Sequence, residues 1–177
     1  MSDKNPFDFI GDEFRRAGII HLLIGGYAVN YYKVTRQTAD IDFLIATKDL
    51  SKIEMILKKF GYQKKSADTL FARFQSDKYL MDLDFLFVDE ETLEGLIKEG
   101  AQINIAGNKY ILPSLTHLIA LKLHAIKSNP EREYRDLPDI INLVKKNHLD
   151  SSTAPFRELC LKYGTKQIYE KIKTASR

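Results

Sequence analysis

Two short acidic motifs stand inside apolar segments of this sequence. The first is Asp40-Ile-Asp42 in "ADIDFLIAT", and the second is Asp82-Leu-Asp84 in "LMDLDFLF". Side chains at positions i and i+2 of a strand point to the same face, about 6.5–7 Å apart along the chain, so each motif presents two carboxylates side by side. Like charges placed in this way repel, and a bound divalent cation offsets the repulsion. Ligands made of oxygen alone favour Mg²⁺ or Mn²⁺.

The repetition of the motif matters more than either copy. A single Asp-x-Asp is readily explained as the solvated end of a strand, but two apolar strands that both carry it are harder to explain as surface edges. If the two strands lie side by side, their carboxylates converge on one spot. A two-metal site for phosphoryl chemistry requires such a cluster.

A glycine pair, Gly25-Gly26, closes the apolar segment "IIHLLIGG", and a short helix is expected from Tyr27. A strand, a glycine turn and a helix N-terminus would expose backbone N–H groups to a phosphate. A tight strand-to-helix turn accounts for the pair equally well. The pattern is neither the GxGxxG of dinucleotide-binding folds nor a P-loop, because no Gly-Lys-Ser/Thr follows it.

The hydrophobic periodicity predicts strands and helices in alternation up to Leu112 and helices alone after Pro113. Strands are expected within 19–26, 39–47, 69–77 and 78–88, with a tight turn near Ser76–Asp77, and a hairpin at 101–112. Helices are expected within 5–18, 27–34, 49–62, 90–100, 114–128, 136–147, 154–164 and 166–176. We therefore expect an α+β fold, with a mixed sheet flanked by helices in residues 1–112 and a helical bundle in residues 113–177.

Composition sets wide limits on function. The chain has 177 residues, of which 44% are hydrophobic and 29% charged, and a net charge of +3. A mildly positive chain suits an anionic ligand such as a nucleotide, but the basic residues form no block typical of nucleic-acid binding. Cys160 stands alone, so no internal disulfide is expected. No signal-peptide core or membrane-spanning run is evident, and we expect a cytoplasmic protein without membrane contact.

Residues 25–45, "GGYAVNYYKVTRQTADIDFLI", resemble the nucleotidyltransferase superfamily typified by DNA polymerase beta, in which a glycine pair or Gly-Ser precedes Asp-x-Asp. The spacing of Arg36 and Thr38 before Asp40 and Asp42 resembles the AbiEii-like toxin and orphan minimal branch. The resemblance implies that the third carboxylate lies on the next core strand and is followed by apolar residues. Asp84 fits that description best, and Asp82 is the reserve.

Residues 112–140 resemble the same branch, in which a helix with a buried-stem lysine precedes an Arg-Asp-x-x-Asp helix start. The resemblance carries Lys122, Arg135, Asp136 and Asp139 across as candidates. Purely structural roles fit these residues as well. Asp136 is a good N-cap with Pro138 in the first turn and Asp139 favourable to the helix dipole. Lys122 could be a lysine whose stem is buried and whose amine reaches water.

The resemblance implies a nucleotidyltransferase that moves a nucleoside monophosphate from an NTP to an acceptor hydroxyl or phosphate with release of pyrophosphate. Asp40, Asp42 and Asp84 would hold Mg²⁺ or Mn²⁺, with Asp84 also the base toward the acceptor. The implied nucleotide contacts are Gly25, Gly26, Arg36, Thr38, Lys122 and Asp136. The implied acceptor is a small molecule, a tRNA or a protein.

Two further functions compete with this one. A nucleotide-binding toxin–antitoxin or regulatory module would keep the fold and act by binding a partner, such as an antitoxin protein, with little turnover. The presence of all three carboxylates argues against a decayed site. A phosphatase of the haloacid dehalogenase type requires Asp-x-Asp-x-Thr, and here Leu44 occupies the threonine position.

Overall fold

The computed structural model describes residues 5–176, and within them the chain forms two compact units. The first unit contains the residues up to Ala28 and Gln37–Ser114. The second contains Val29–Arg36 and the residues from Leu115 onward. The chain therefore leaves the first unit for eight residues just before the first acidic motif, a detour that no sequence pattern indicates. The division at residue 112 that the sequence suggests stays a prediction.

The first unit is built on a five-stranded sheet in the order β1-β2-β5-β4-β3. Its strands are β1 (His21–Leu23), β2 (Asp40–Ala46), β3 (Gln63–Ala67), β4 (Phe71–Gln75) and β5 (Asp82–Val88). The central strands β2 and β5 are parallel, and the other neighbours are antiparallel. The expected mixed sheet, and with it the α+β class, is confirmed.

Two features of this sheet differ from the sequence prediction. Strand β3 was not predicted, because all five of its residues are exposed and it has no apolar face. An edge strand of this kind is specified by pairing with its neighbour and not by its own side chains. The predicted tight turn at Ser76–Asp77 is also wrong, because the connection from β4 to β5 runs from residue 76 to residue 81.

The strands β6 (Ala101–Ile105) and β7 (Asn108–Leu112) form the expected hairpin. Its two linking residues, Ala106 and Gly107, have φ of 50° and 77°. Two successive positive φ values are typical of the turns that match the twist of a two-residue hairpin.

The helices of the first unit are α1 (Pro6–Arg16), α3 (Leu50–Lys59) and α4 (Glu90–Lys98), and α2 (Gly25–Tyr31) begins in it. Asn5 caps α1 by accepting a hydrogen bond from the Phe7 amide, and Asp89 caps α4 through Thr92. Helix α2 starts two residues before the position expected from sequence, so both glycines lie in its first turn. The apolar faces of the strands and helices meet in a core that contains Phe14, Phe43 and Phe85.

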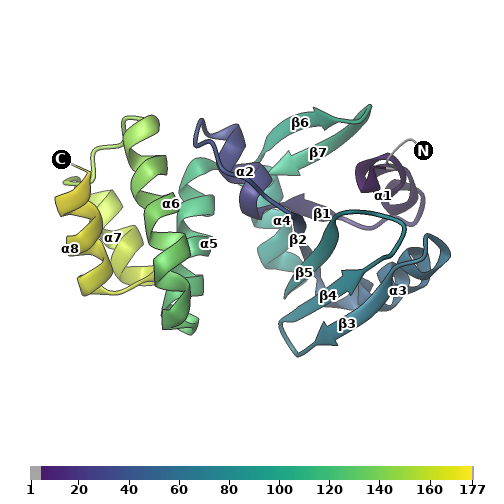
Figure 1. The fold of residues 1–177 in the computed structure, drawn as a ribbon. Coiled ribbons are helices and arrows are strands. Elements are labelled where there is room, and N and C mark those ends of the chain that lie inside the picture. The colour runs from purple at the N-terminus through teal and green to yellow at the C-terminus, as the bar shows by residue number, and fades with distance from the viewer. Residues whose placement is uncertain (1–4, 177) are drawn as a thin grey trace. The chain divides into compact units, whose positions relative to one another are not determined.

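The second unit is helical after Leu115, as expected (Figure 1). Its helices are α5 (Leu115–Ser128), α6 (Glu133–Lys146), α7 (Ala154–Tyr163) and α8 (Lys166–Ala175), with a short 3₁₀ turn at Pro130–Arg132. Helix α6 begins three residues earlier than predicted, and its N-cap position is Arg132. Asp136 is therefore not an N-cap, and Pro138 lies inside the helix.

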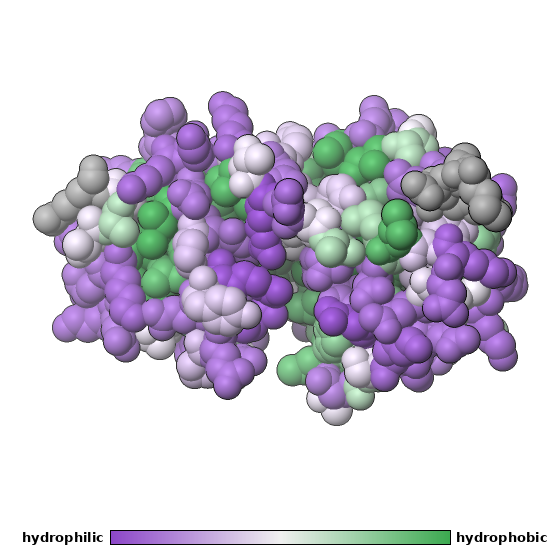
Figure 2. Space-filling model, viewed as in Figure 1, coloured by the Kyte–Doolittle hydropathy of each residue, from purple (hydrophilic) through white to green (hydrophobic). Residues whose placement is uncertain are grey.

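The surface view in Figure 2 is mostly hydrophilic, with apolar patches over parts of both units. Within residues 5–176, no helix combines the length and the apolar character needed to cross a membrane.

Candidate active site and a second ion cluster

The parallel register of β2 and β5 places the two acidic motifs next to each other. Asp40 is opposite Asp82, and Asp42 is opposite Asp84. The two apolar strands that carry Asp-x-Asp are therefore neighbours, which was the condition for their carboxylates to converge. Because parallel strands share a direction, both motifs lie at the same end of the two strands, where β2 and β5 begin.

Three of these side chains form one compact group. Asp40, Asp42 and Asp84 each offer a carboxylate oxygen, and these oxygens all lie within 4.8 Å of one another. Asp84 is 4% exposed, whereas Asp40 and Asp42 are half-buried and open to a ligand. An all-carboxylate donor set with water access suits Mg²⁺ or Mn²⁺, since hard cations prefer oxygen. The residues thus fit the metal that the resemblance implies.

Asp84 has a partner that the sequence analysis missed. Arg73 on β4 donates to both of its oxygens, from Nε at 2.8 Å and from Nη2 at 2.5 Å. The antiparallel register explains the contact, because Arg73 is directly opposite Asp84. Alignment of "FARFQ" against "DLDFLF" across the connecting loop could have indicated this pair.

Asp82 has different surroundings, although it shares the face of Asp84. It accepts a hydrogen bond of 2.7 Å from Nε2 of Gln75, the next residue of β4 on that face. Strand β4 therefore sets an arginine against one aspartate of the second motif and a neutral amide against the other.

Gly25 is packed against the acidic group. A Cβ at this position would lie 1.8 Å from Oδ2 of Asp42, and the residue has a φ of +63°. Both facts require glycine, because any side chain would displace the carboxylate and the conformation is strained for other residues. The positive φ occurs at Gly25 and not at Gly26.

Gly26 and Thr38 form the second close approach near the first motif. A Cβ on Gly26 would lie 2.6 Å from Cβ of Thr38. The hydroxyl of Thr38 is 3.0 Å from both the backbone oxygen and Oδ1 of Asp40, and it can donate its hydrogen to either. The observed contacts of Thr38 thus hold Asp40 in place.

The remaining candidates lie together in the second unit. Lys122 on α5 donates to Oδ1 of Asp136 at 2.8 Å and to Oδ2 of Asp139 at 2.7 Å, both on α6. Arg36 donates to the same Oδ2 of Asp139 at 2.6 Å. Lys122 is 7% exposed and bound to two carboxylates, so its amine does not reach out to water.

Asp136 is the most enclosed member of this ion cluster. It is fully buried, and its second oxygen accepts from Nε of Arg132 at 2.8 Å. Burial alone would raise the pKa of the Asp136 carboxyl, but the charges and hydrogen bonds of Lys122 and Arg132 outweigh it and lower that pKa. Arg135 is exposed. Three cations and two carboxylates thus satisfy one another in the second unit.

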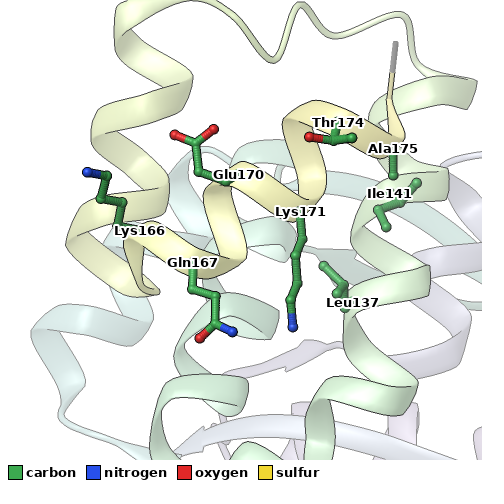
Figure 3. A pocket seen from close by; sticks show the side chains of 8 residues that line it. All are labelled: Leu137, Ile141, Lys166, Gln167, Glu170, Lys171, Thr174 and Ala175. Atoms are coloured by element: carbon green, nitrogen blue, oxygen red, sulfur yellow. The ribbon is translucent and has the colours of Figure 1, made fainter.

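A surface groove between α6 and α8 belongs to the second unit and contains none of the predicted site residues (Figure 3). Leu137 and Ile141 line it from α6, and Lys171 on α8 lies beside Leu137. The amine of Lys171 donates to Oε1 of Glu133 at 2.5 Å. The residues that line it are Leu137, Ile141, Lys166, Gln167, Glu170, Lys171, Thr174 and Ala175.

A family model described as "Uncharacterised nucleotidyltransferase" matches residues 9–173 of the chain. The comparison with curated proteins gives no match.

Several solved structures share the fold. The lincosamide antibiotic adenylyltransferase LnuA bound to lincomycin has a TM-score of 0.56 and 18% identity over 80% of this chain and 98% of its own. An antigenic nucleotidyltransferase-like protein from Paracoccidioides brasiliensis has a TM-score of 0.58 and 14% identity over 96% and 89%. ANT(2")-Ia in complex with adenylyl-2"-tobramycin has a TM-score of 0.53 and 15% identity over 94% and 91%.

Proposed function

This chain belongs to the nucleotidyltransferase family that matches residues 9–173, and on that premise we propose that it transfers a nucleoside monophosphate from an NTP to an acceptor hydroxyl or phosphate. The observation that carries the proposal is the parallel pairing of β2 and β5, which gathers Asp40, Asp42 and Asp84. A lone acidic motif is compatible with many roles. Two such motifs, in register at the start of two neighbouring strands, fit the demands of metal-assisted phosphoryl transfer best.

Asp40, Asp42 and Asp84 would hold Mg²⁺ or Mn²⁺. When bound, such an ion neutralises charge on the triphosphate and on the leaving pyrophosphate. Thr38 fixes one of these ligands, because its hydroxyl is in hydrogen-bond contact with Asp40. Gly25 makes room for another, Asp42. Much of the catalysis would come from this positioning, since phosphoryl transfer requires little covalent chemistry from the protein.

The triphosphate would lie against the backbone N–H groups of Gly25 and Gly26, as the resemblance implies. Arg36, Lys122 and Asp136 are expected nucleotide contacts on the same basis. Each of them also has an ion-pair partner in the second unit, so the position of each side chain has a structural cause of its own. Their contact with a nucleotide therefore remains an expectation from the resemblance.

A small hydroxylated molecule is the acceptor class that we favour. The proteins of similar fold include an adenylyltransferase bound to lincomycin and a protein in complex with adenylyl-2"-tobramycin. A tRNA or a protein is the alternative acceptor. Membership of the AbiEii-like branch, with an antitoxin partner, is proposed from the resemblance of residues 25–45 and 112–140, and the expected cytoplasmic location has a separate basis in composition, the single Cys160.

The test is to incubate the protein with each α-labelled NTP, Mg²⁺ or Mn²⁺ and a small-molecule fraction, an RNA fraction or a protein fraction of a cell extract. We expect label to enter one fraction in a metal-dependent reaction. Replacement of Asp84 by Asn should reduce the rate by at least ~100-fold, because it removes a charge needed in the transition state.

The matched control is Asp82→Asn, which changes the same residue type two positions away on the same strand face. It should reduce the rate less than Asp84→Asn. A larger effect at Asp82 would move the third metal ligand to that residue. NTP binding without transfer to any fraction would favour a nucleotide-binding toxin–antitoxin or regulatory module over the enzyme.

A further inference from the structure

Arg73 places a positive charge directly on the carboxylate group that we assign to metal. Its guanidinium forms the bidentate contact with Asp84, which is 4% exposed, while the arginine side chain itself is 40% exposed. Asp84, Asp82 and Asp40 all act on this cation and raise the pKa of the guanidinium. The guanidinium of Arg73 is therefore a fixed positive charge that faces several carboxylates where β2 and β5 begin.

The choice of residues on β4 indicates that the charge matters. Arg73 and Gln75 occupy equivalent positions on one face of the strand, and each binds one aspartate of the second motif. The neutral amide binds Asp82, which lies outside the compact acidic group. The cation binds Asp84, which lies within it. An amide in place of Arg73 could not reproduce this bidentate contact and would bring no charge to the acidic group.

A bidentate guanidinium restricts what else Asp84 can bind. A carboxylate has about four lone-pair directions, of which this contact occupies two. A divalent ion could take a remaining direction or displace the arginine. In the first case it would stand near a fixed positive charge, and a unit charge about 5 Å from a divalent ion weakens its binding roughly 10-fold even at a water-like dielectric constant. In the second case metal binding would have to break the two hydrogen bonds between Arg73 and Asp84.

We propose that Arg73 is a positioning residue that acts as the resident counter-ion of the metal-free acidic group. It orients Asp84 and offsets the repulsion among the carboxylates, and it weakens metal binding by the protein alone. A bound NTP brings negative phosphates that attract both the metal and the guanidinium, so metal loading is coupled to the arrival of the nucleotide. This inference rests on the proposed metal site of Asp40, Asp42 and Asp84.

The experiment measures Mn²⁺ affinity by calorimetry for the whole chain without nucleotide, together with the thermal midpoint with and without Mn²⁺. Arg73→Met should bind Mn²⁺ at least ~10-fold more tightly than the parent, from the charge term above. Its metal-free form should melt at a lower temperature, and saturating Mn²⁺ should raise its midpoint more than that of the parent. Arg73→Lys keeps the charge, so its Mn²⁺ affinity should stay near the parental value.

Lys64→Met is the matched control for the loss of one positive charge. Lys64 lies on β3 of the same sheet and pairs with the exposed Glu54, outside the acidic group. It should leave Mn²⁺ affinity unchanged. If Arg73→Met binds Mn²⁺ no more tightly than the parent, the counter-ion role is wrong while the metal site stands. If neither protein binds Mn²⁺, the metal site itself is overturned and the counter-ion role falls with it.

A second measurement tests the coupling to nucleotide. A non-hydrolysable NTP analogue should tighten Mn²⁺ binding more in the parent than in Arg73→Met, because only the parent has an arginine to draw away from Asp84. An equal gain in both proteins would contradict the coupling.

Discussion

Each unit gathers charged side chains into a cluster, but cations outnumber carboxylates in the second unit and carboxylates outnumber cations in the first. In the second unit, two aspartates meet three cations, and the fully buried Asp136 is bound by Lys122 and Arg132. In the first unit, three carboxylates come within 4.8 Å of one another and the arginine on Asp84 offsets them in part. Asp40 and Asp42 remain half-buried and accessible.

We infer from this difference that the cluster of the second unit stabilises the fold, whereas the acidic group of the first unit is suited to bind a cation. Charges removed from water require compensation inside the protein, and the second unit supplies it from its own side chains. In the first unit three carboxylates converge where β2 and β5 begin, with access to water and with Arg73 on Asp84, and a divalent cation would relieve their mutual repulsion. Charge balance within each cluster thus distinguishes their roles better than the mere presence of aspartates does.

The largest effect on the free energy of unfolding is expected from a substitution in the ion cluster of the second unit. Asp136→Asn keeps the shape of the side chain but turns an acceptor oxygen into a donor amide that faces Lys122 or Arg132. Loss of one partner from a buried ion cluster should lower the free energy of unfolding by about 3 kcal/mol. Urea denaturation of the whole chain at pH 7 measures it. Glu133→Gln, which breaks the exposed pair with Lys171 on the same helix, should cost less than ~1 kcal/mol.

The pH dependence of the same pair of proteins gives an independent check. The folded protein lowers the pKa of Asp136, so near pH 4 the unfolded chain binds more protons there. The stabilisation is therefore complete above the unfolded pKa of about 3.9 and is lost as the pH falls through the lower folded value. The gap between the parent and Asp136→Asn should narrow below about pH 4. A gap that is constant from pH 7 to pH 3 would mean that charge is not its cause.

An intermediate effect, on Mn²⁺ affinity, is expected at Gly25, because the lack of a side chain there leaves room for the carboxylate of Asp42. Gly25→Ala would place a methyl group against Oδ2 of Asp42 at a positive φ. We expect Mn²⁺ binding to weaken about 10-fold, or about 1.4 kcal/mol, as Asp42 is pushed away. Calorimetry measures the affinity. Gly18→Ala is the control, since Gly18 also has a positive φ but has open space where the Cβ would go. Equal Mn²⁺ affinity in both variants would show that Asp42 adjusts freely.

The sequence predicted the parts of the site that depend on local pattern. The two Asp-x-Asp motifs could be selected because a repeated charge in an apolar strand is costly without a ligand. Asp84 was preferred to Asp82 only because the resemblance implies a third carboxylate that is followed by apolar residues. Their pairing was only a condition at that stage, since register between strands depends on the whole sheet. The strand β3 could not be found, because its exposed residues carry no periodicity and its neighbour specifies it.

Arg73 and the ion cluster of the second unit illustrate the harder cases. Arg73 is unremarkable in the sequence, and only the antiparallel register opposite Asp84 gives it a role. Asp136 was an equally good N-cap by pattern, because Asp before Leu-Pro-Asp suits a helix start. The helix instead begins at Glu133, and the buried pairing with Lys122 outweighs the local preference. Long-range charge pairing is not encoded in any short window.

The smallest effect, and the one of opposite sign, is expected at Asp42. Asp42→Asn keeps the shape that fits beside Gly25 and removes one of three mutually repelling charges. Without metal, the free energy of unfolding should be unchanged or higher by up to ~1 kcal/mol, the size of one such repulsion near water. With saturating Mn²⁺ the order should reverse, because the ion binds and stabilises only a folded parent with all its ligands. Urea denaturation with EDTA and with Mn²⁺ measures both states. If Asp42→Asn is instead the less stable protein in EDTA, the Asp42 carboxylate stabilises the fold, and the contrast between a balanced cluster and an open one does not hold.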